Sequence, residues 1–165
     1  MYDLKKYLSK KVHGIIHVGA NTGQEVPYYK TLCEKIYLFE PVPDVFQTLK
    51  SLESDTIKCY NCAIGEFEGI QTLYLCSNNN LSASLLAPAL HKHMFGVKFE
   101  GTIQVQVKRL SSFAFYKECN VLVIDVQGAE IGVLNSIEDF SGFDLIMTEV
   151  SNCQLYEGNA IDTDI

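Results

Sequence analysis

The sequence of 165 residues lacks any apolar run that approaches the ~18 residues a membrane-spanning helix needs. Its charged start also lacks the apolar core of a signal peptide, so we expect a cytoplasmic protein with no membrane span. Basic residues are few, with 13 Lys and Arg against 20 Asp and Glu and a formal net charge of −7. This balance gives no general attraction for nucleic-acid phosphates, and no nucleic-acid partner is expected.

Disulfide and metal-binding patterns are also lacking. The six cysteines are scattered along the chain, so we expect reduced core thiols. Cys59 and Cys62 form a lone C-x-x-C pair, and on an alternating strand they would point to opposite faces, which disfavours a zinc or redox site. His91 and His93 form a loop pair with no nearby acid, which is more typical of polar surface or a substrate contact than of a metal site.

Length and composition fit a single domain over residues 1–165. Hydrophobic residues make up 47% and charged residues 20%, as in ordinary globular proteins. In residues 1–12, Leu4, Tyr7 and Leu8 form a helical apolar stripe beside several lysines, which predicts an N-terminal helix docked on the domain. A role for these lysines at a membrane surface or on nucleic acid is the less favoured alternative.

The hydrophobic periodicity predicts alternating strands and helices. "IIHV", "KIYLFE", "NVLVID" and "FDLIMTEVS" are expected strands, the last two buried, while "PDVFQTLKSL" and "AEIGVLNSI" place apolar residues on one helical face. "IQTLYLC" and "TIQVQVKRL" alternate as half-exposed strands do, and "TIKCYNCAIG" predicts one strand with Ile57, Cys59, Asn61 and Ala63 on a shared face. We therefore expect a doubly wound α/β domain with a mostly parallel sheet, whose ligands bind beyond the carboxyl ends of the strands.

The turn "GANTG" after the first expected strand lacks the G-x-G-x-x-G spacing of a dinucleotide site. Gly19 and Gly23 still allow the backbone to approach a ligand closely, although a glycine turn alone is equally well explained by backbone geometry. Glu40 ends the next strand, at roughly the distance (~20 residues) at which an acid binds the hydroxyls of a ribose. The turn and the acid together favour a ribose-containing ligand. Residues 77–101 form a long stretch without periodicity, which is usually functional or mobile.

Six segments of the chain occur in a recognisable order and at plausible spacing. They are "IIHVGANTGQE", "LFEPVPDVFQTL", "NCAIGEFEG", "LSASLL", "VLVIDVQGAEIGVLNSI" and "MTEVSNCQLYEG". Together they resemble the FkbM-type S-adenosylmethionine-dependent methyltransferases, from about Gly14 to the end of the chain. The resemblance implies a class I methyltransferase fold of Rossmann-like type, S-adenosylmethionine as cofactor, and methyl transfer to a hydroxyl of a sugar or small metabolite.

The resemblance also implies which residues surround the cofactor. It puts the glycine turn around the methionine part, Glu40 on the ribose, and Asn61 and Ala63 beside the adenine. The full implied set is His17, Gly19, Ala20, Asn21, Gly23, Glu25, Glu40, Pro41, Asn61, Cys62, Ala63, Ser82, Ser84 and Asp125.

The candidate catalytic residues are Asp125, Glu149 and Glu130, with His91 as a further candidate. Methyl transfer needs an acceptor oxygen in line with the methyl group, and the acceptor proton must leave, so both positioning and a base could contribute. Asp125 matches the acid of "DVQGAE" and is expected near the reactive methyl, as a base or a metal ligand or only to orient the loop backbone. Glu130 could equally cap the helix that begins at Ala129.

The chain departs from the family pattern in three places. His17 and Ser111 stand where many members have Asp. The family continues beyond "LYEG" with a helix and a closing antiparallel strand pair, whereas this chain stops at Ile165. We therefore expect a shortened sheet without that pair, whose exposed edge would favour a homodimer.

Two alternatives to a methyltransferase stay open. One is a binding module that holds the cofactor but does not catalyse. The other is an NAD-dependent oxidoreductase on a similar fold, which the missing G-x-G-x-x-G disfavours.

Overall fold

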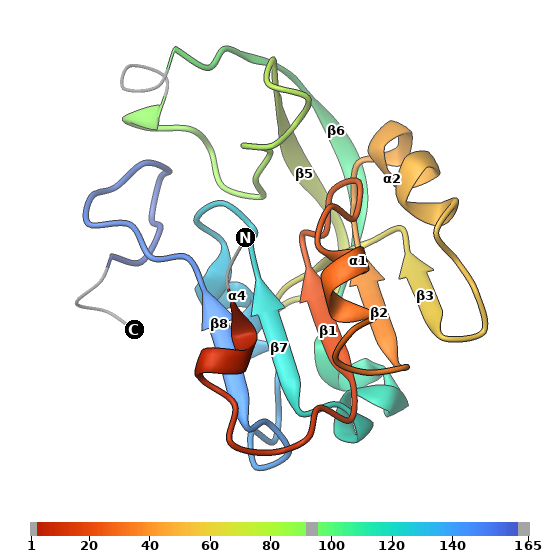
Figure 1. Cartoon of the computed structure of the whole chain (residues 1–165). Coiled ribbons are helices and arrows are strands. Elements are labelled where there is room, and N and C mark those ends of the chain that lie inside the picture. The colour runs from red at the N-terminus through yellow and green to blue at the C-terminus, as the bar shows by residue number, and fades with distance from the viewer. Residues whose placement is uncertain (1–2, 92–95, 162–165) are drawn as a thin grey trace.

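Five parallel strands form the main sheet, in the order β3-β2-β1-β7-β8 (Figure 1). The structure is a computed structural model that describes residues 3–91 and 96–161. It confirms the doubly wound, mostly parallel α/β fold. The strands of this sheet are β1 (Ile15–Val18), β2 (Ile36–Phe39), β3 (Ile57–Tyr60), β7 (Val121–Ile124) and β8 (Leu145–Thr148).

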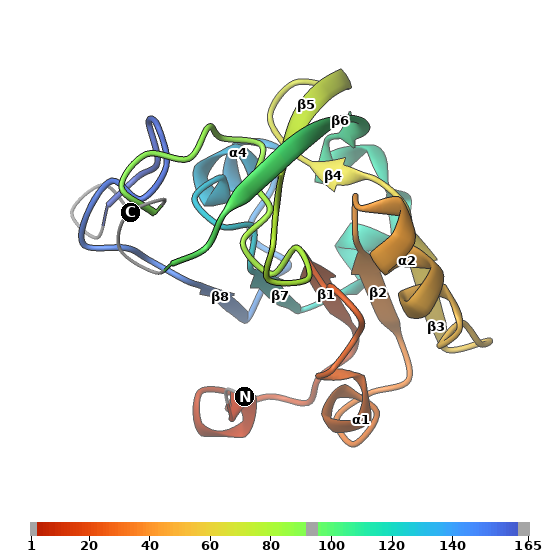
Figure 2. The ribbon, with the colours of Figure 1, turned by 90° about the horizontal axis from the view of Figure 1, so that it is seen from above.

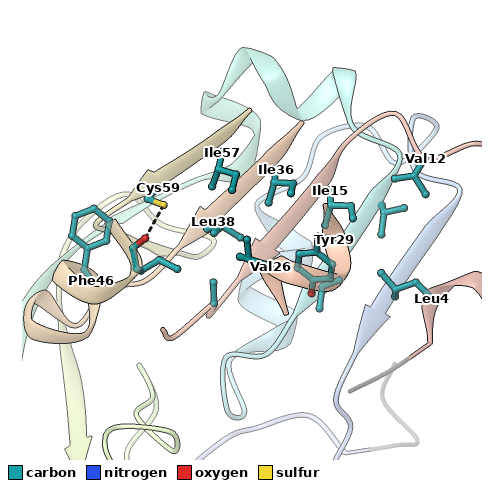
Figure 3. Packing of buried hydrophobic residues seen from close by; sticks show 14 residues of the cluster. Leu4, Val12, Ile15, Val26, Tyr29, Ile36, Leu38, Phe46, Ile57 and Cys59 are labelled. Carbon is teal, nitrogen blue, oxygen red and sulfur yellow. Dashed lines mark hydrogen bonds between the residues drawn. The ribbon is translucent and has the colours of Figure 1, made fainter. Parts of the chain in front are cut away.

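Helices cover both faces of the main sheet, because alternate side chains of its strands are apolar on both sides. Ile15 faces α1 (Val26–Tyr29) and α2 (Pro43–Lys50), whose apolar residues complete one buried cluster (Figure 3). Ile16 faces α4 (Glu130–Asn135) and the 3-10 turns Leu110–Ser112 and Ala114–Glu118. Seen from above, α1 and α4 lie on opposite sides of the sheet (Figure 2).

A second sheet of three strands, in the order β4-β6-β5, lies beyond the carboxyl edge of the main sheet (Figure 1). Its strands are β4 (Ala63–Ile64), β5 (Gly69–Cys76) and β6 (Phe99–Lys108), and β5 runs antiparallel to β6. The single strand expected from Ile57 to Ala63 is therefore wrong: the chain leaves the main sheet after Tyr60, and Ala63 pairs with Val107. Cys59 and Cys62 pack into different clusters, but Cys62 lies after the end of β3 and not on the same strand as Cys59.

Three other expectations differ from the structure. The N-terminal helix is a single 3-10 turn, Leu4–Lys6, because only Leu4 is buried while the Tyr7 ring is exposed. Strand β8 is half-exposed and not buried, since it lies at the edge of the sheet and pairs only with β7. His91 is buried in ring contacts with Phe99 and Tyr156 and is not polar surface; His93 lies outside the described residues.

Within residues 3–91 and 96–161, no helix has the length and apolarity needed to cross a membrane. All six cysteines carry free thiols in the structure, and four of them, Cys59, Cys62, Cys76 and Cys119, are buried.

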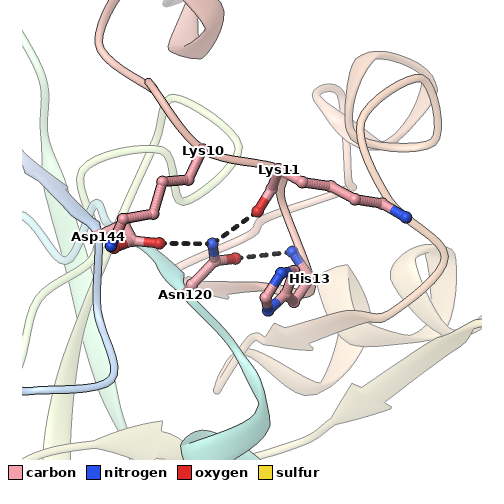
Figure 4. Close-up of polar contacts among 5 residues, drawn as sticks. All are labelled: Lys10, Lys11, His13, Asn120 and Asp144. Atoms are coloured by element: carbon pink, nitrogen blue, oxygen red, sulfur yellow. Dashed lines mark hydrogen bonds and ion pairs between the residues drawn. The ribbon is translucent and has the colours of Figure 1, made fainter.

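Asn120 joins three segments at the amino edge of the main sheet (Figure 4). Its side-chain Oδ1 accepts a hydrogen bond from the His13 backbone N–H at 2.8 Å. Its Nδ2 donates to the Lys11 carbonyl and to Asp144 Oδ2, each at 2.9 Å. Asp144 also forms an ion pair with the exposed Lys10. The buried amide of Asn120, directly before β7, thus joins the segments that precede β1 and β8.

We predict that Asn120→Ala lowers the free energy of unfolding by roughly 1–3 kcal/mol, because it removes the hydrogen bonds of a buried amide and leaves the partly buried His13 N–H and Lys11 carbonyl without that partner. Lys10→Ala is the matched control, since an exposed ion pair contributes only about 0–1 kcal/mol. Urea denaturation of both variants measures the difference. Equal losses would mean that the Asn120 side chain does not hold this edge together.

Candidate functional site

The carboxyl ends of β1, β2 and β7 open into a cavity, which we call the first cavity. Its empty space of about 620 Å³ includes space open to solvent. The main sheet contributes its polar wall, with Gly19, Asn21, Glu40 and Asp125. The second sheet and the loop between its strands β5 and β6 close the cavity with mostly apolar side chains: Ile64, Leu73, Asn80, Leu81, Ala83, Ser84 and Leu85.

The turn after β1 is held tightly between its two neighbouring strands. The backbone N–H groups of Gly19 and Ala20 both donate to the Phe39 carbonyl, at 3.0 and 2.9 Å. Gly19 has φ +83°, and a Cβ on it would lie 1.8 Å from the Asp125 carbonyl oxygen. No other residue fits there, so the backbone itself forms the wall of the cavity at this point.

Glu40 is a buried carboxylate whose two oxygens are each fixed by one backbone N–H. Oε2 accepts from Asn21 at 3.1 Å and Oε1 from Val42 at 2.8 Å. Burial raises the pKa of Glu40 to about 7, and the two N–H bonds only partly offset that effect. Each oxygen keeps a further lone pair. Glu40 can therefore accept hydrogen bonds from two hydroxyl groups of a ligand in the cavity.

Asp125 follows β7 and is held by Gln127, whose Nε2 donates to Asp125 Oδ1 at 2.6 Å and lies 3.4 Å from Glu149 Oε2. The pKa of Asp125 is raised to about 6, mainly by burial and in smaller part by the charges of Glu149, Glu130 and Glu25, against the lowering effect of the Gln127 bond. At neutral pH this carboxylate is largely ionised but basic enough to accept a proton.

Of the other residues implied for the cofactor, His17 and Glu25 line a different cavity, and the remaining eight fall into two groups. Pro41, Cys62, Ala63 and Ser84 line the first cavity together with the residues above. Four others lie near it but do not line it: Ala20, Gly23, Asn61 and Ser82.

Two of the four have their side chains committed to other contacts. Asn61 Nδ2 donates to the Glu40 and Pro41 carbonyls, at 2.9 and 3.2 Å. Ser82 Oγ accepts from Asn78. Both side chains therefore hold neighbouring segments in place and do not contact a ligand in the cavity.

Glu130 is also committed, because its Oε1 accepts from the Gly128 backbone N–H at 3.0 Å. It is buried at the start of α4, burial raises its pKa, and it lines neither cavity described here. Glu130 lies in the first turn of α4, and its hydrogen bond holds the loop before the helix and not an N–H of the helix itself.

His17, Glu25 and Glu149 line a second cavity, whose empty space of about 800 Å³ includes space open to solvent; Asp125 lines both cavities. His17 is 5% exposed, and its Nδ1 lies 3.2 Å from the Tyr29 hydroxyl. Burial lowers the pKa of His17 to about 4, so the imidazole is neutral at physiological pH.

Several lining residues were not foreseen from the sequence. Gln127 stands inside the quoted "DVQGAE" segment, and its polar side chain between two acids was the available signal. Asn80 and Leu81 belong to the stretch without periodicity, which gives no signal for single residues. Tyr29 packs among the apolar residues of the core, yet its hydroxyl lies 3.2 Å from His17 Nδ1 and the residue lines the second cavity.

Among the described residues that line either cavity, none is Lys or Arg. A dinucleotide would have to bring its pyrophosphate beside Glu40 and Asp125 without a cation, which is unfavourable. A cofactor without phosphates, with a ribose for Glu40, fits this donor and acceptor set. The part of the chain that the structure describes also holds no group of three His, Cys, Asp or Glu placed to bind a metal ion.

Comparisons with known proteins show the family and the fold of this chain. Residues 17–165 match the methyltransferase FkbM domain. "Methyltransferase 1" of Beauveria bassiana (strain ARSEF 2860) is 30% identical over an alignment that covers 76% of this chain and 58% of that protein. The crystal structure of methyltransferase FkbM from Methylobacillus flagellatus KT has a similar fold, with a TM-score of 0.51 at 15% identity.

The coverage of these relatives is partial. The structural match covers 82% of this chain but 32% of the crystallised chain. This chain thus spans a little over half of the curated relative and a third of the solved one. The family match itself extends over most of the sequence, and on that basis the chain belongs to the FkbM methyltransferase domain family.

Proposed function

We propose that this protein binds S-adenosylmethionine in the first cavity and transfers its methyl group to a hydroxyl of a sugar or small metabolite. The observation that carries the proposal is Glu40, a buried acid with two free acceptor positions in a cavity lined by no Lys or Arg among the described residues. Family membership supports methyl transfer and gives no support to the NAD-dependent alternative.

The lining of the first cavity offers a separate contact for each part of the cofactor. Glu40 would accept the two ribose hydroxyls, and the turn at Gly19 and Asn21 would let the methionine part lie against backbone. Cys62 and Ala63, with the apolar side chains above them, would hold the flat adenine. S-adenosylmethionine supplies a methyl group on a positively charged sulfur.

Asp125 would receive the proton that the acceptor hydroxyl loses on methylation. With a pKa raised to about 6, it is mostly ionised near pH 7 and remains a better base than an ordinary aspartate. Gln127 fixes its orientation, and Glu149 lies on the far side of the same amide. Glu130 would act only by holding the loop at Gly128.

Glu40→Ala should weaken the binding of S-adenosylhomocysteine by at least about tenfold, because buried ribose hydroxyls would lose their acceptor. Isothermal titration calorimetry measures the dissociation constant. Glu34→Ala, at an exposed position outside both cavities, is the control and should bind like the wild type. Unchanged affinity in Glu40→Ala would overturn the ribose assignment.

The same affinity should fall about tenfold between about pH 8 and about pH 6, because the raised pKa of Glu40, about 7, means that the acid form predominates at the lower pH. A protonated carboxyl loses acceptor capacity, so binding is strongest above the pKa. Glu40→Gln should bind weakly with a flatter profile, whereas Asp125→Asn should keep the pH dependence. A wild-type profile that is flat over this interval would contradict the assignment.

Methyl transfer itself is tested by following S-adenosylhomocysteine release against a panel of sugars and small alcohols. Asp125→Asn should lower kcat by roughly a hundredfold while changing cofactor affinity only a few-fold. Cofactor binding without turnover on any member of the panel would favour the alternative of a binding module.

A further inference from the structure

The second cavity shares Asp125 with the first as a lining residue. Its floor is a row of side chains at one level of the sheet, His17 of β1, Val123 of β7 and Met147 of β8, which the strand register aligns. Two residues further along, Asp125 and Glu149 stand at its rim. Because methyl transfer is in line, an acceptor must approach from the side opposite the cofactor sulfur.

The opposite wall comes from α1 and the N-terminal turn. Tyr28 and Tyr29 line this wall together with Glu25 and Leu4. The Tyr28 hydroxyl donates to Asp3 at 3.0 Å and accepts from the Lys5 N–H at 3.3 Å, which ties the N-terminal turn to α1. The cavity therefore lies between the N-terminal turn and α1 on one side and the strands β1, β7 and β8 on the other.

The charged side chains that line the second cavity are all acidic. Three carboxylates, Glu25, Asp125 and Glu149, face a cavity that, within the described part of the chain, has no Lys or Arg in its wall. A second, independent feature is His17: this nearly fully buried side chain lines the cavity, and its Nε2 has no hydrogen-bond partner among the residues that the structure describes. Buried polar atoms are normally hydrogen-bonded, so a buried nitrogen without a partner indicates that a polar ligand in the cavity forms the hydrogen bond.

We propose that the second cavity is the methyl-acceptor site and that it selects uncharged or cationic hydroxyl compounds while rejecting acceptors that carry a phosphate or carboxylate. Hydroxyl and ammonium donors find acceptors in Glu25 and Glu149, whereas an anion placed there meets like charges. This inference rests on the proposed methyltransferase function, but the charge selection of the cavity can be tested without turnover.

Thr148→Cys puts a thiol in the wall of this cavity, and Tyr28→Cys puts one in the opposite wall. Each variant is treated with trimethylammonioethyl or sulfonatoethyl methanethiosulfonate, and mass spectrometry of peptides follows labelling of the new cysteine. Rates are divided by those of the same reagents with free 2-mercaptoethanol. We expect the cationic reagent to be favoured at least about tenfold, and Glu149→Gln in the same background to reduce that preference several-fold.

The rise in melting temperature that S-adenosylhomocysteine causes is measured on the labelled proteins, and it separates cofactor binding in the first cavity from acceptor binding in the second. We expect this thermal shift to persist after labelling, because the label occupies the second cavity and not the first. Equal normalised rates for the two reagents in both variants would overturn the charge selection. Loss of the shift on labelling, with the shift intact before labelling, would assign this cavity to the cofactor and overturn the acceptor site. No shift even before labelling would instead count against the proposed function.

Discussion

The contact between Gly19 and the carbonyl of Asp125 fixes the geometry on which both cavities depend. A Cβ at Gly19 would lie 1.8 Å from that oxygen, so the ends of β1 and β7 touch through backbone alone. This close contact leaves the Asp125 side chain at the junction of the two cavities. The same turn carries Asn21, whose N–H holds Glu40, so one glycine couples the two acids that define the site.

The sequence was a good guide wherever function depends on local spacing. Gly19, Glu40 and Asp125 each directly follow a parallel strand. Because parallel strands have their carboxyl ends at one edge of the sheet, the sequence pattern predicts that these three residues lie close together. Ala63 was also expected beside the ligand, but for an incomplete reason. It lines the cavity because the chain leaves the main sheet between Tyr60 and Ala63, not because one strand continues.

What the sequence could not predict depends on contacts between distant segments. Alternation continues through Asn61, yet the backbone turns away there, and the Asn61 amide binds the Glu40 and Pro41 carbonyls. Leu81 lies in a stretch without periodicity and reaches the cavity only because the second sheet carries that loop over the main one. Tyr29 has the spacing of a core residue, and only the packing of α1 on β1 reveals that its hydroxyl meets His17.

Two carboxyl groups of the site, those of Glu40 and Asp125, are held in surroundings that disfavour their charge. Burial raises the pKa of Glu40 to about 7 and of Asp125 to about 6, which means that the protein environment opposes their ionisation. Backbone N–H groups and the Gln127 amide offset only part of that cost, and among the described lining residues no Lys or Arg offsets the rest. A ligand with a sulfonium and an ammonium group would supply the missing positive charge. The carboxylates whose burial is costly in the free protein are thus the groups that favour a cationic ligand over an anionic one.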